Sequence, residues 1–207
     1  MPSSGVRVGL FVTCLVDLIR PQVGFAAVRL LEDAGCEVVV PRHQTCCGQP
    51  AYNAGDRANA SALARQALEA FEDVDYIVTP SGSCAAILRL HAPELLADSP
   101  ELADRVKAFS EKVFALTTFL SEVIGVARLS RAAKKNSART IVYHDSCTGL
   151  RELGIREAPR ELLSRLSGLH PQELPERDVC CGFGGTFCVK FPEISERLAA
   201  DKCLAAE

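Results

Sequence analysis

A duplicated cysteine pattern constrains the fold of this chain more than any other feature of its sequence. Each copy has one cysteine directly after an apolar, strand-like run and a Cys-Cys-Gly string further on: Cys14 with Cys46, Cys47 and Gly48, then Cys147 with Cys180, Cys181 and Gly182. The second copy repeats the first at an offset of 133 to 134 positions. Self-similarity at a fixed offset indicates that one structural unit occurs twice.

The sequence around these cysteines alternates short β-branched runs with longer segments whose apolar residues recur at helical spacing. We predict strands at 6–13, 36–40, 76–79, 140–143 and 169–174, and helices at 21–34, 56–71, 84–96, 101–112, 117–124, 159–166 and 192–205. Strands separated by helices are typical of parallel βαβ units. The predicted fold class is therefore α/β: two similar lobes, each with a short parallel sheet flanked by helices, the second lobe lacking its last strand. The predicted domains are 1–127 for the first lobe and 140–207 for the second, C-terminally incomplete lobe, with a polar linker at 128–139.

Four cysteines of the first lobe are expected to meet at one edge of its sheet. Cys14 follows the first predicted strand, Cys46 and Cys47 follow the second, and Cys84 follows the third, where a helix begins. Open parallel sheets bind their ligands at the carboxyl ends of the strands. Cysteine thiolates are ligands of soft metals and iron–sulfur centres. The pattern therefore predicts a metal centre held by these four residues.

Composition and charge narrow the class of protein. The chain has 10 cysteines but no secretory signal at its N-terminus, so we expect a reducing, cytoplasmic location in which clustered cysteines bind metal rather than form disulfides. No apolar run is long enough to span a membrane. A net charge of −3 without a long basic run disfavours nucleic acid as a partner.

Four strings carry a resemblance to a known family: GLFVTC at 9–14, CCGQP at 46–50, PSGSC at 80–84 and CGFGGTF at 181–187. With the doubled Cys-Cys-Gly motif they resemble the cysteine-rich CCG-domain family, and within it the lactate-utilization branch. The resemblance implies a [4Fe-4S] cluster and an electron-transfer subunit of a complex that oxidises L-lactate to pyruvate. It also implies two partners, a ferredoxin-like iron–sulfur protein and a third lactate-utilization protein.

The sequence departs from the family pattern at two places. Ser81 stands where heterodisulfide reductase has a cysteine, so the first set has four ligands rather than five. The repeat also predicts a last cysteine near position 218, beyond Glu207. Cys147, Cys180 and Cys181 then lack a fourth ligand unless Cys188 or Cys203 replaces it, and we expect the second site to be weak or empty.

Other interpretations remain open at this stage. Four thiolates also hold zinc in structural or regulatory sites. The family resemblance is compatible with a subunit of another 2-hydroxy-acid oxidase, such as a glycolate oxidase, or of a heterodisulfide reductase-like enzyme.

Several single residues are assigned structural roles. Cys36 is expected in the core, His43 in an exposed loop, and His144 and Asp145 in hydrogen-bonded structural positions, with a proton relay as the alternative. His91 and His170 are also expected to be structural. The catalytic residues are unknown.

Overall fold

The computed structural model describes residues 5–126, 129, 141–167, 169–175 and 177–206. We call residues 5–126 the first half and residues 141–206 the second half. The predicted linker at 128–139 lies outside the described residues except for Leu129, as does the first residue of the strand predicted at 140–143. The predicted division into domains therefore stays a prediction.

The first half contains a parallel sheet of four strands in the order β2-β1-β3-β4. The strands are β1 (Arg7–Leu10), β2 (Glu37–Val39), β3 (Tyr76–Thr79) and β4 (Val113–Ala115). The register pairs Gly9 of β1 with Val39 of β2 and with Ile77 of β3. Because β1 lies between β2 and β3, the chain first passes from β1 to β2 at one edge of the sheet. It then crosses to β3 on the other side of β1 and continues to β4 at the opposite edge.

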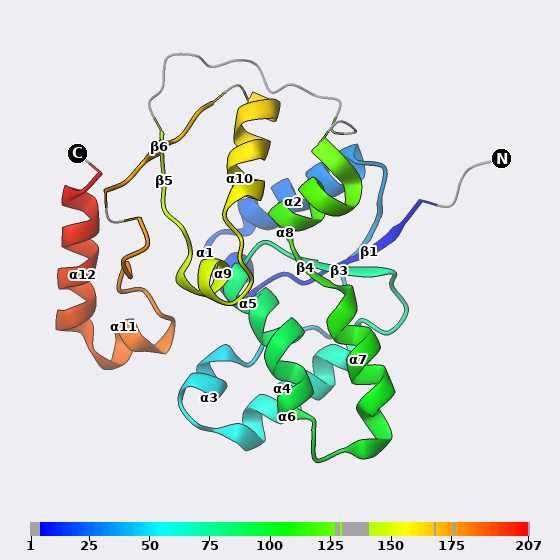
Figure 1. Cartoon of the computed structure of the whole chain (residues 1–207). Helices are drawn as coiled ribbons and strands as arrows, with labels where there is room; N and C mark the ends of the chain where they lie inside the picture. Colours follow the sequence, from blue (N-terminus) through cyan, green and yellow to red (C-terminus); the bar gives the residue numbers. More distant parts are fainter. Residues whose placement is uncertain (1–4, 127–128, 130–140, 168, 176, 207) are drawn as a thin grey trace.

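Helices cover both faces of this sheet (Figure 1). They are α1 (Cys14–Ile19), α2 (Pro21–Asp33), α3 (Gln49–Asn53), α4 (Arg57–Ala70), α5 (Gly82–Ala86), α6 (Ala92–Leu95), α7 (Ala103–Lys112) and α8 (Leu116–Thr118). Two π-helical segments, Ile87–His91 and Phe119–Gly125, extend α5 and α8, and a 3-10 turn, Pro100–Leu102, precedes α7.

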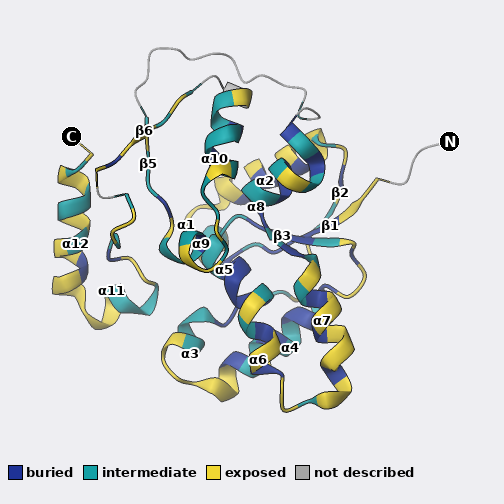
Figure 2. Ribbon diagram, in the orientation of Figure 1, coloured by how far each residue is buried: buried dark blue, intermediate teal, exposed yellow. Residues whose placement is uncertain are grey.

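Successive side chains of the central strands point to opposite faces of the sheet, and each face has its own hydrophobic core. In β3, Ile77 packs with α4, α5 and α7, whereas its neighbour Val78 packs with α2 and the Phe119–Gly125 segment. Successive side chains of a strand point to opposite faces, so each central strand contributes to both cores. Figure 2 shows the central strands and α5 as largely buried.

The second half has a smaller sheet of two parallel strands, β5 (Val142–Tyr143) and β6 (Gln172–Glu173), within the residues described. Its helices are α9 (Cys147–Arg151), α10 (Glu157–Leu162), α11 (Thr186–Lys190) and α12 (Pro192–Leu204), with a π-helical segment at Leu163–Ser167 after α10. Leu162 of α10 is buried in the core that α2 and β1 form, so the two halves share part of one core.

The predicted α/β class, with two parallel sheets flanked by helices, is confirmed. The strand β4 was not predicted, because the sequence between 101 and 124 was interpreted as two helices only. The short helices α1, α3, α9 and α11 were also missed. Two of them begin at the predicted ligands Cys14 and Cys147, for which the sequence predicted only a position after a strand.

Candidate metal centre

The four cysteines of the first half lie beyond the carboxyl ends of three neighbouring strands. Cys14 is the first residue of α1 after β1, Cys46 and Cys47 lie between β2 and α3, and Cys84 lies in α5 after β3. In the order β2-β1-β3, the connection after β1 leads to one side of this strand and the strand on its other side is β3. The strand order therefore reverses between β1 and β3. Ligands of open α/β sheets bind at such a point.

Two short distances join the four sulfurs in pairs. Sγ of Cys14 lies 4.0 Å from Sγ of Cys46, and Sγ of Cys47 lies 3.2 Å from Sγ of Cys84. The two pairs also interact with each other. Cys46 hydrogen-bonds with Cys47, and the charges of Cys14 and Cys46 act to raise the pKa of Cys84. The structure therefore brings the four predicted ligands into one group, which we call the first cysteine group.

The first cysteine group has a buried side and an accessible side. Cys47 and Cys84 are 3% and 7% exposed, whereas Cys14 and Cys46 are half-buried. A hollow of about 380 Å³ lies against Cys14 and Cys46, with Asp17, Leu18 and Arg42 in its lining. A centre bound here is therefore approached from the α1 side.

The thiols differ in how readily they ionise. Hydrogen bonds from the Cys47 thiol and Ser81 lower the pKa of Cys84, although burial opposes them. A bond with Cys46 favours ionisation of Cys47, but the bond to Cys84 and burial outweigh it and raise the pKa of Cys47 to about 12. The pKa of Cys46 is raised by hydrogen bonding to Cys47 and by burial, and that of Cys14 by burial and the nearby Cys46. A cation bound among the thiols would favour ionisation of Cys14, Cys46 and Cys47, whose pKa values are raised.

The side chain of Gln44 fastens the Cys46-Cys47 segment to the end of β1. Its Oε1 accepts a hydrogen bond of 2.7 Å from the Val12 backbone N–H, and its Nε2 donates one of 3.2 Å to the Leu10 carbonyl. Both bonds form between the second strand's loop and the residues that lead into Cys14. This role of Gln44 was not predicted from the sequence, because a polar loop residue carries no local signal of a long-range contact.

Ser81 has a second role besides replacing a cysteine. It is the N-cap of α5, and its Oγ accepts a hydrogen bond of 3.4 Å from the backbone N–H of Cys84. Serine is a preferred N-cap residue. The spacing of a serine three residues before a helical cysteine was a signal from which this cap could have been predicted.

Each Cys-Cys-Gly string ends in a left-handed glycine that lies against a helix. Gly48 has φ of 92°, and a Cβ there would lie 3.5 Å from the Ala60 carbonyl of α4. Gly182 has φ of 81°, and a Cβ would lie 2.5 Å from the Ser195 carbonyl of α12. The left-handed conformation favours glycine at both positions, and at Gly182 the close helix backbone also excludes a side chain. The two halves therefore repeat this local arrangement as well as the sequence.

The second cysteine group comprises Cys147, Cys180 and Cys181. Burial raises the pKa of Cys147, and hydrogen bonding and charge from Cys180, together with charge from Cys181, raise it further. In the described part of the chain, no sulfur–sulfur contact joins Cys188 or Cys203 to them: Cys188 donates to the Gly185 carbonyl at 3.0 Å, and Cys203 is exposed.

The helices that carry the two groups touch each other. α5 packs against α9, and a Cβ on Gly82 would lie only 3.1 Å from Cα of Gly149. Two glycines allow this approach because neither has a side chain. Cys84 and Cys147 therefore lie on contacting helices.

The spacing within each thiol pair is near that of two ligands of one metal ion. Tetrahedral zinc with bonds of about 2.3 Å places its sulfurs about 3.8 Å from one another, and the two pairs lie at 4.0 and 3.2 Å. Among the described residues, no three cysteine, histidine or acidic side chains are arranged to hold a metal ion.

Other predicted residues have structural roles. Cys36 is buried in the core with α2, and His43 is exposed, as expected. His144 Nδ1 lies 3.1 Å from the Arg177 carbonyl, and burial lowers the pKa of its ring. Asp145 is buried and forms two hydrogen bonds with Arg160.

His91 and Glu152 link the two halves. His91 Nε2 lies 2.6 Å from the Glu152 carboxylate, and the imidazole packs against the Tyr52 ring at an angle of 41° with 4.7 Å between the ring centres. His170 is exposed. The structural role expected for His91 is therefore confirmed.

The fold and the cysteine geometry define a class of protein: an α/β protein with a duplicated cysteine centre. A family model described as "cysteine-rich domain" (CCG) matches residues 8–89 and 141–207. Curated relatives named lactate utilization protein A are 45% identical over 202 residues in Bacillus subtilis (98% of this chain, 83% of the relative) and 45% identical over 197 residues in Geobacillus kaustophilus (95% and 80%). In Halalkalibacterium halodurans the identity is 43% over 197 residues (95% and 79%). The chain therefore belongs to the cysteine-rich CCG-domain family, in the branch of the lactate utilization A proteins.

Proposed function

We propose that Cys14, Cys46, Cys47 and Cys84 hold a [4Fe-4S] cluster and that the chain transfers electrons in a multi-protein system that oxidises L-lactate to pyruvate. The observation that carries this proposal is the convergence of four thiols from the three segments that follow β1, β2 and β3 at the carboxyl edge of a parallel sheet. The relatives' name supplies the metabolic role. We infer a cytoplasmic location and two partners, a ferredoxin-like iron–sulfur protein and a third lactate-utilization protein.

A cluster of this type accepts and releases single electrons, at a potential that depends on its hydrogen bonds and solvent exposure. The chain's own residues set both conditions. Cys47 and Cys84 keep one side of the centre dry, while Gln44 and the Ser81 cap hold the loops that carry the thiols. Cys14 and Cys46 face the hollow beside α1, so an electron partner approaches there.

The second cysteine group is proposed to bind metal more weakly than the first. Cys147, Cys180 and Cys181 provide three thiols, and a stable [4Fe-4S] centre uses four. In the part of the chain that the structure describes, no cysteine completes the set.

None of the described helices combines the length and apolarity needed to cross a membrane.

The test is L-lactate-dependent reduction of the anaerobically purified complex. The full chain is co-purified with its two partners, and its broad visible absorption is followed after addition of L-lactate. We expect bleaching to the extent that dithionite produces. A cluster that dithionite bleaches but L-lactate leaves unchanged would contradict the lactate assignment. A zinc protein without visible absorption would contradict the cluster.

A further inference from the structure

A pocket of about 320 Å³ lies between the two halves at the carboxyl end of β4. The first half contributes the π-helical segment after α5, the end of β4 and the α8 helix, and the second half contributes residues 152–158. This volume is within the range of small-ligand sites. The pocket is separate from the first cysteine group but adjacent to it, since its wall includes Ala85, the residue after Cys84.

Most charged groups of the pocket already have partners. Arg156 pairs with Glu157 at 3.7 Å, and Glu152 bonds His91 at 2.6 Å. Arg89 and Glu122 remain, and neither forms an ion pair within the described ranges. Arg89 is half-buried, so its charge is partly removed from water without a carboxylate to balance it.

Two contacts fix the direction of the Arg89 side chain. Its Nη1 donates to the Val113 carbonyl at 2.7 Å, and its Cζ lies 5.0 Å from the centre of the Phe114 ring. Guanidinium has five N–H donors in a rigid fork that matches carboxylate geometry. The remaining donors are therefore preorganised for an anionic group without further loss of side-chain freedom.

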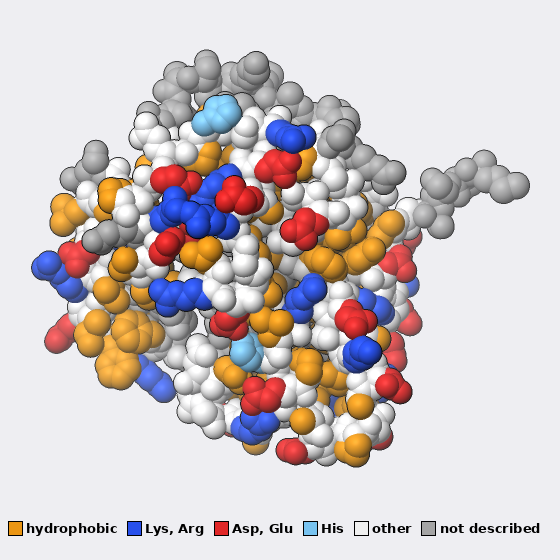
Figure 3. Space-filling view, viewed as in Figure 1, with side chains coloured by type: hydrophobic (Ala, Val, Ile, Leu, Met, Phe, Trp, Pro, Cys, Tyr) orange, Lys and Arg blue, Asp and Glu red, His pale blue; other side chains and the backbone are white. Residues whose placement is uncertain are grey.

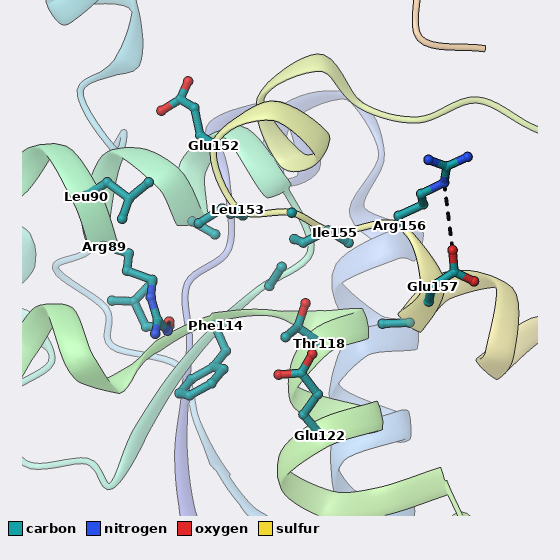
Figure 4. Close-up of a pocket in the computed structure, with 15 residues that line it drawn as sticks. Arg89, Leu90, Phe114, Thr118, Glu122, Glu152, Leu153, Ile155, Arg156 and Glu157 are labelled. Atoms are coloured by element: carbon teal, nitrogen blue, oxygen red, sulfur yellow. Dashed lines mark hydrogen bonds and ion pairs between the residues drawn. The ribbon is translucent and has the colours of Figure 1, made fainter.

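Figure 4 shows how the polar groups face one another across the pocket. Arg89 and Phe114 lie on one side, Thr118 and Glu122 lie on the other, and Leu153 and Ile155 cover the space between them. The Thr118 hydroxyl is buried and has no hydrogen-bond partner in the described structure. The pocket therefore has a cationic end at Arg89 and an end at Thr118 and Glu122 that accepts hydrogen bonds. Leu153 and Ile155 form an apolar cover over both.

We propose that this pocket binds a small 2-hydroxy carboxylate. The carboxylate binds to Arg89 and is oriented away from the negative Glu122, the 2-hydroxyl donates to the Glu122 carboxylate, and the short alkyl group packs under Leu153 and Ile155. The proposal rests on the proposed function, in which such an acid is the source of electrons, and it assigns the position of that acid beside the helix of Cys84.

The experiment is a ligand-observed NMR titration of the anaerobically purified full chain with L-lactate and with propionate, which lacks the hydroxyl. Three variants are compared with wild type: Arg89→Lys, Glu122→Gln, and Arg65→Lys as a control for loss of an arginine that bonds Ser99 elsewhere. We expect L-lactate to bind at least about tenfold more weakly to Arg89→Lys, because charge-assisted bidentate bonds are lost. Glu122→Gln should bind the two acids more equally, and Arg65→Lys should match wild type.

Each outcome decides the proposal. Absence of L-lactate binding to wild type, equal binding of propionate, or unchanged binding in both pocket variants overturns it. Because Glu122 is exposed, Glu122→Gln is expected to fold. If Arg89→Lys does not fold, the binding of L-lactate and propionate to Glu122→Gln still decides the proposal. Iron and sulfide are measured in the same samples. A chain with a cluster but without lactate binding overturns this inference alone, and lactate binding that depends on Arg89 in a chain without iron overturns the proposed function alone.

Discussion

Replacing Arg160 with methionine should destabilise the second half strongly. All five N–H groups of Arg160 have acceptors: both Asp145 oxygens at 2.9 and 2.8 Å, both Glu173 oxygens at 2.5 and 2.8 Å, and the Arg156 carbonyl at 2.6 Å. The guanidinium also lies 4.8 Å from the centre of the Tyr143 ring. One side chain therefore ties α10 to β5, β6 and the residue that leads into Cys147.

The magnitude follows from the burial of the two partners. The Asp145 side chain is 1% exposed and Arg160 is 14% exposed. Removing one partner of a buried ion pair leaves an uncompensated charge and costs about 3–5 kcal/mol. A sheet of two strands is marginal without additional packing, so few contacts compensate. For a chain of this size the loss corresponds to a fall in the melting temperature of roughly 6–20 °C.

The assay is urea unfolding followed by far-ultraviolet circular dichroism, since the chain has no tryptophan. Arg177→Met is the matched control: Arg177 pairs with Glu173 at 2.9 Å and is 27% exposed, so its loss should cost about 1 kcal/mol or less. Figure 3 shows these interleaved basic and acidic side chains over α10 and the β5–β6 strands. The double variant Asp145→Leu/Arg160→Met should be more stable than Arg160→Met alone. Equal, small losses for Arg160→Met and Arg177→Met would refute the reasoning.

Three further predictions concern the cysteine segments and the ion pairs. Gln44→Leu should lower the iron content of the purified chain, because it removes both bonds to the end of β1, while Gln22→Leu on the exposed face of α2 should not. Equal iron in the two variants would contradict the role of Gln44 in holding the Cys46-Cys47 segment. Gly182→Ala should lower the free energy of unfolding by about 2–5 kcal/mol, because alanine is strained in the left-handed conformation and its Cβ would clash with α12. Gly35→Ala, where nothing lies within 4 Å of the added Cβ, should lower it by only about 1–2 kcal/mol. Urea unfolding measures both values, and equal losses would contradict the contribution of packing against α12. Hydrogen bonding to Arg160 lowers the pKa of Glu173, so the contribution of Glu173 to stability is present above the ordinary carboxyl pKa and is lost as pH falls through the lowered value. The free energies of unfolding of wild type and Glu173→Gln should therefore differ near neutral pH and converge in acid. A constant difference between the two proteins across this pH range would contradict the prediction.

The sequence predicted elements with strong local signals. The helix α4 begins after Asp56, whose carboxylate accepts from the Asn59 backbone N–H, and α2 begins with Pro21 in its first turn. The strand Tyr76–Thr79 was predicted at its observed bounds. The strand β4 was missed because Val113–Ala115 has only three residues and no turn residue before it; pairing with β3 makes it a strand.

The candidate site was predictable in part. Their positions after strands expected to be parallel placed Cys14, Cys46, Cys47 and Cys84 at one edge, and the structure brings their sulfurs together. Their role as ligands stays a prediction. Gln44 and the Asp145–Arg160 pair were not predictable as fixing residues, because their partners lie 15 or more positions away and follow no periodic pattern.

Metal and sulfide analysis distinguishes an iron–sulfur centre at the first cysteine group from any other use of these thiols. It compares three anaerobically purified proteins: wild type, Cys47→Ser, and Cys36→Ser as a control at a buried cysteine outside both groups. We expect about four irons and four sulfides per chain in wild type and in Cys36→Ser, and a large loss of both in Cys47→Ser. Iron that is unchanged in Cys47→Ser would contradict this expectation, as would zinc in place of iron in wild type.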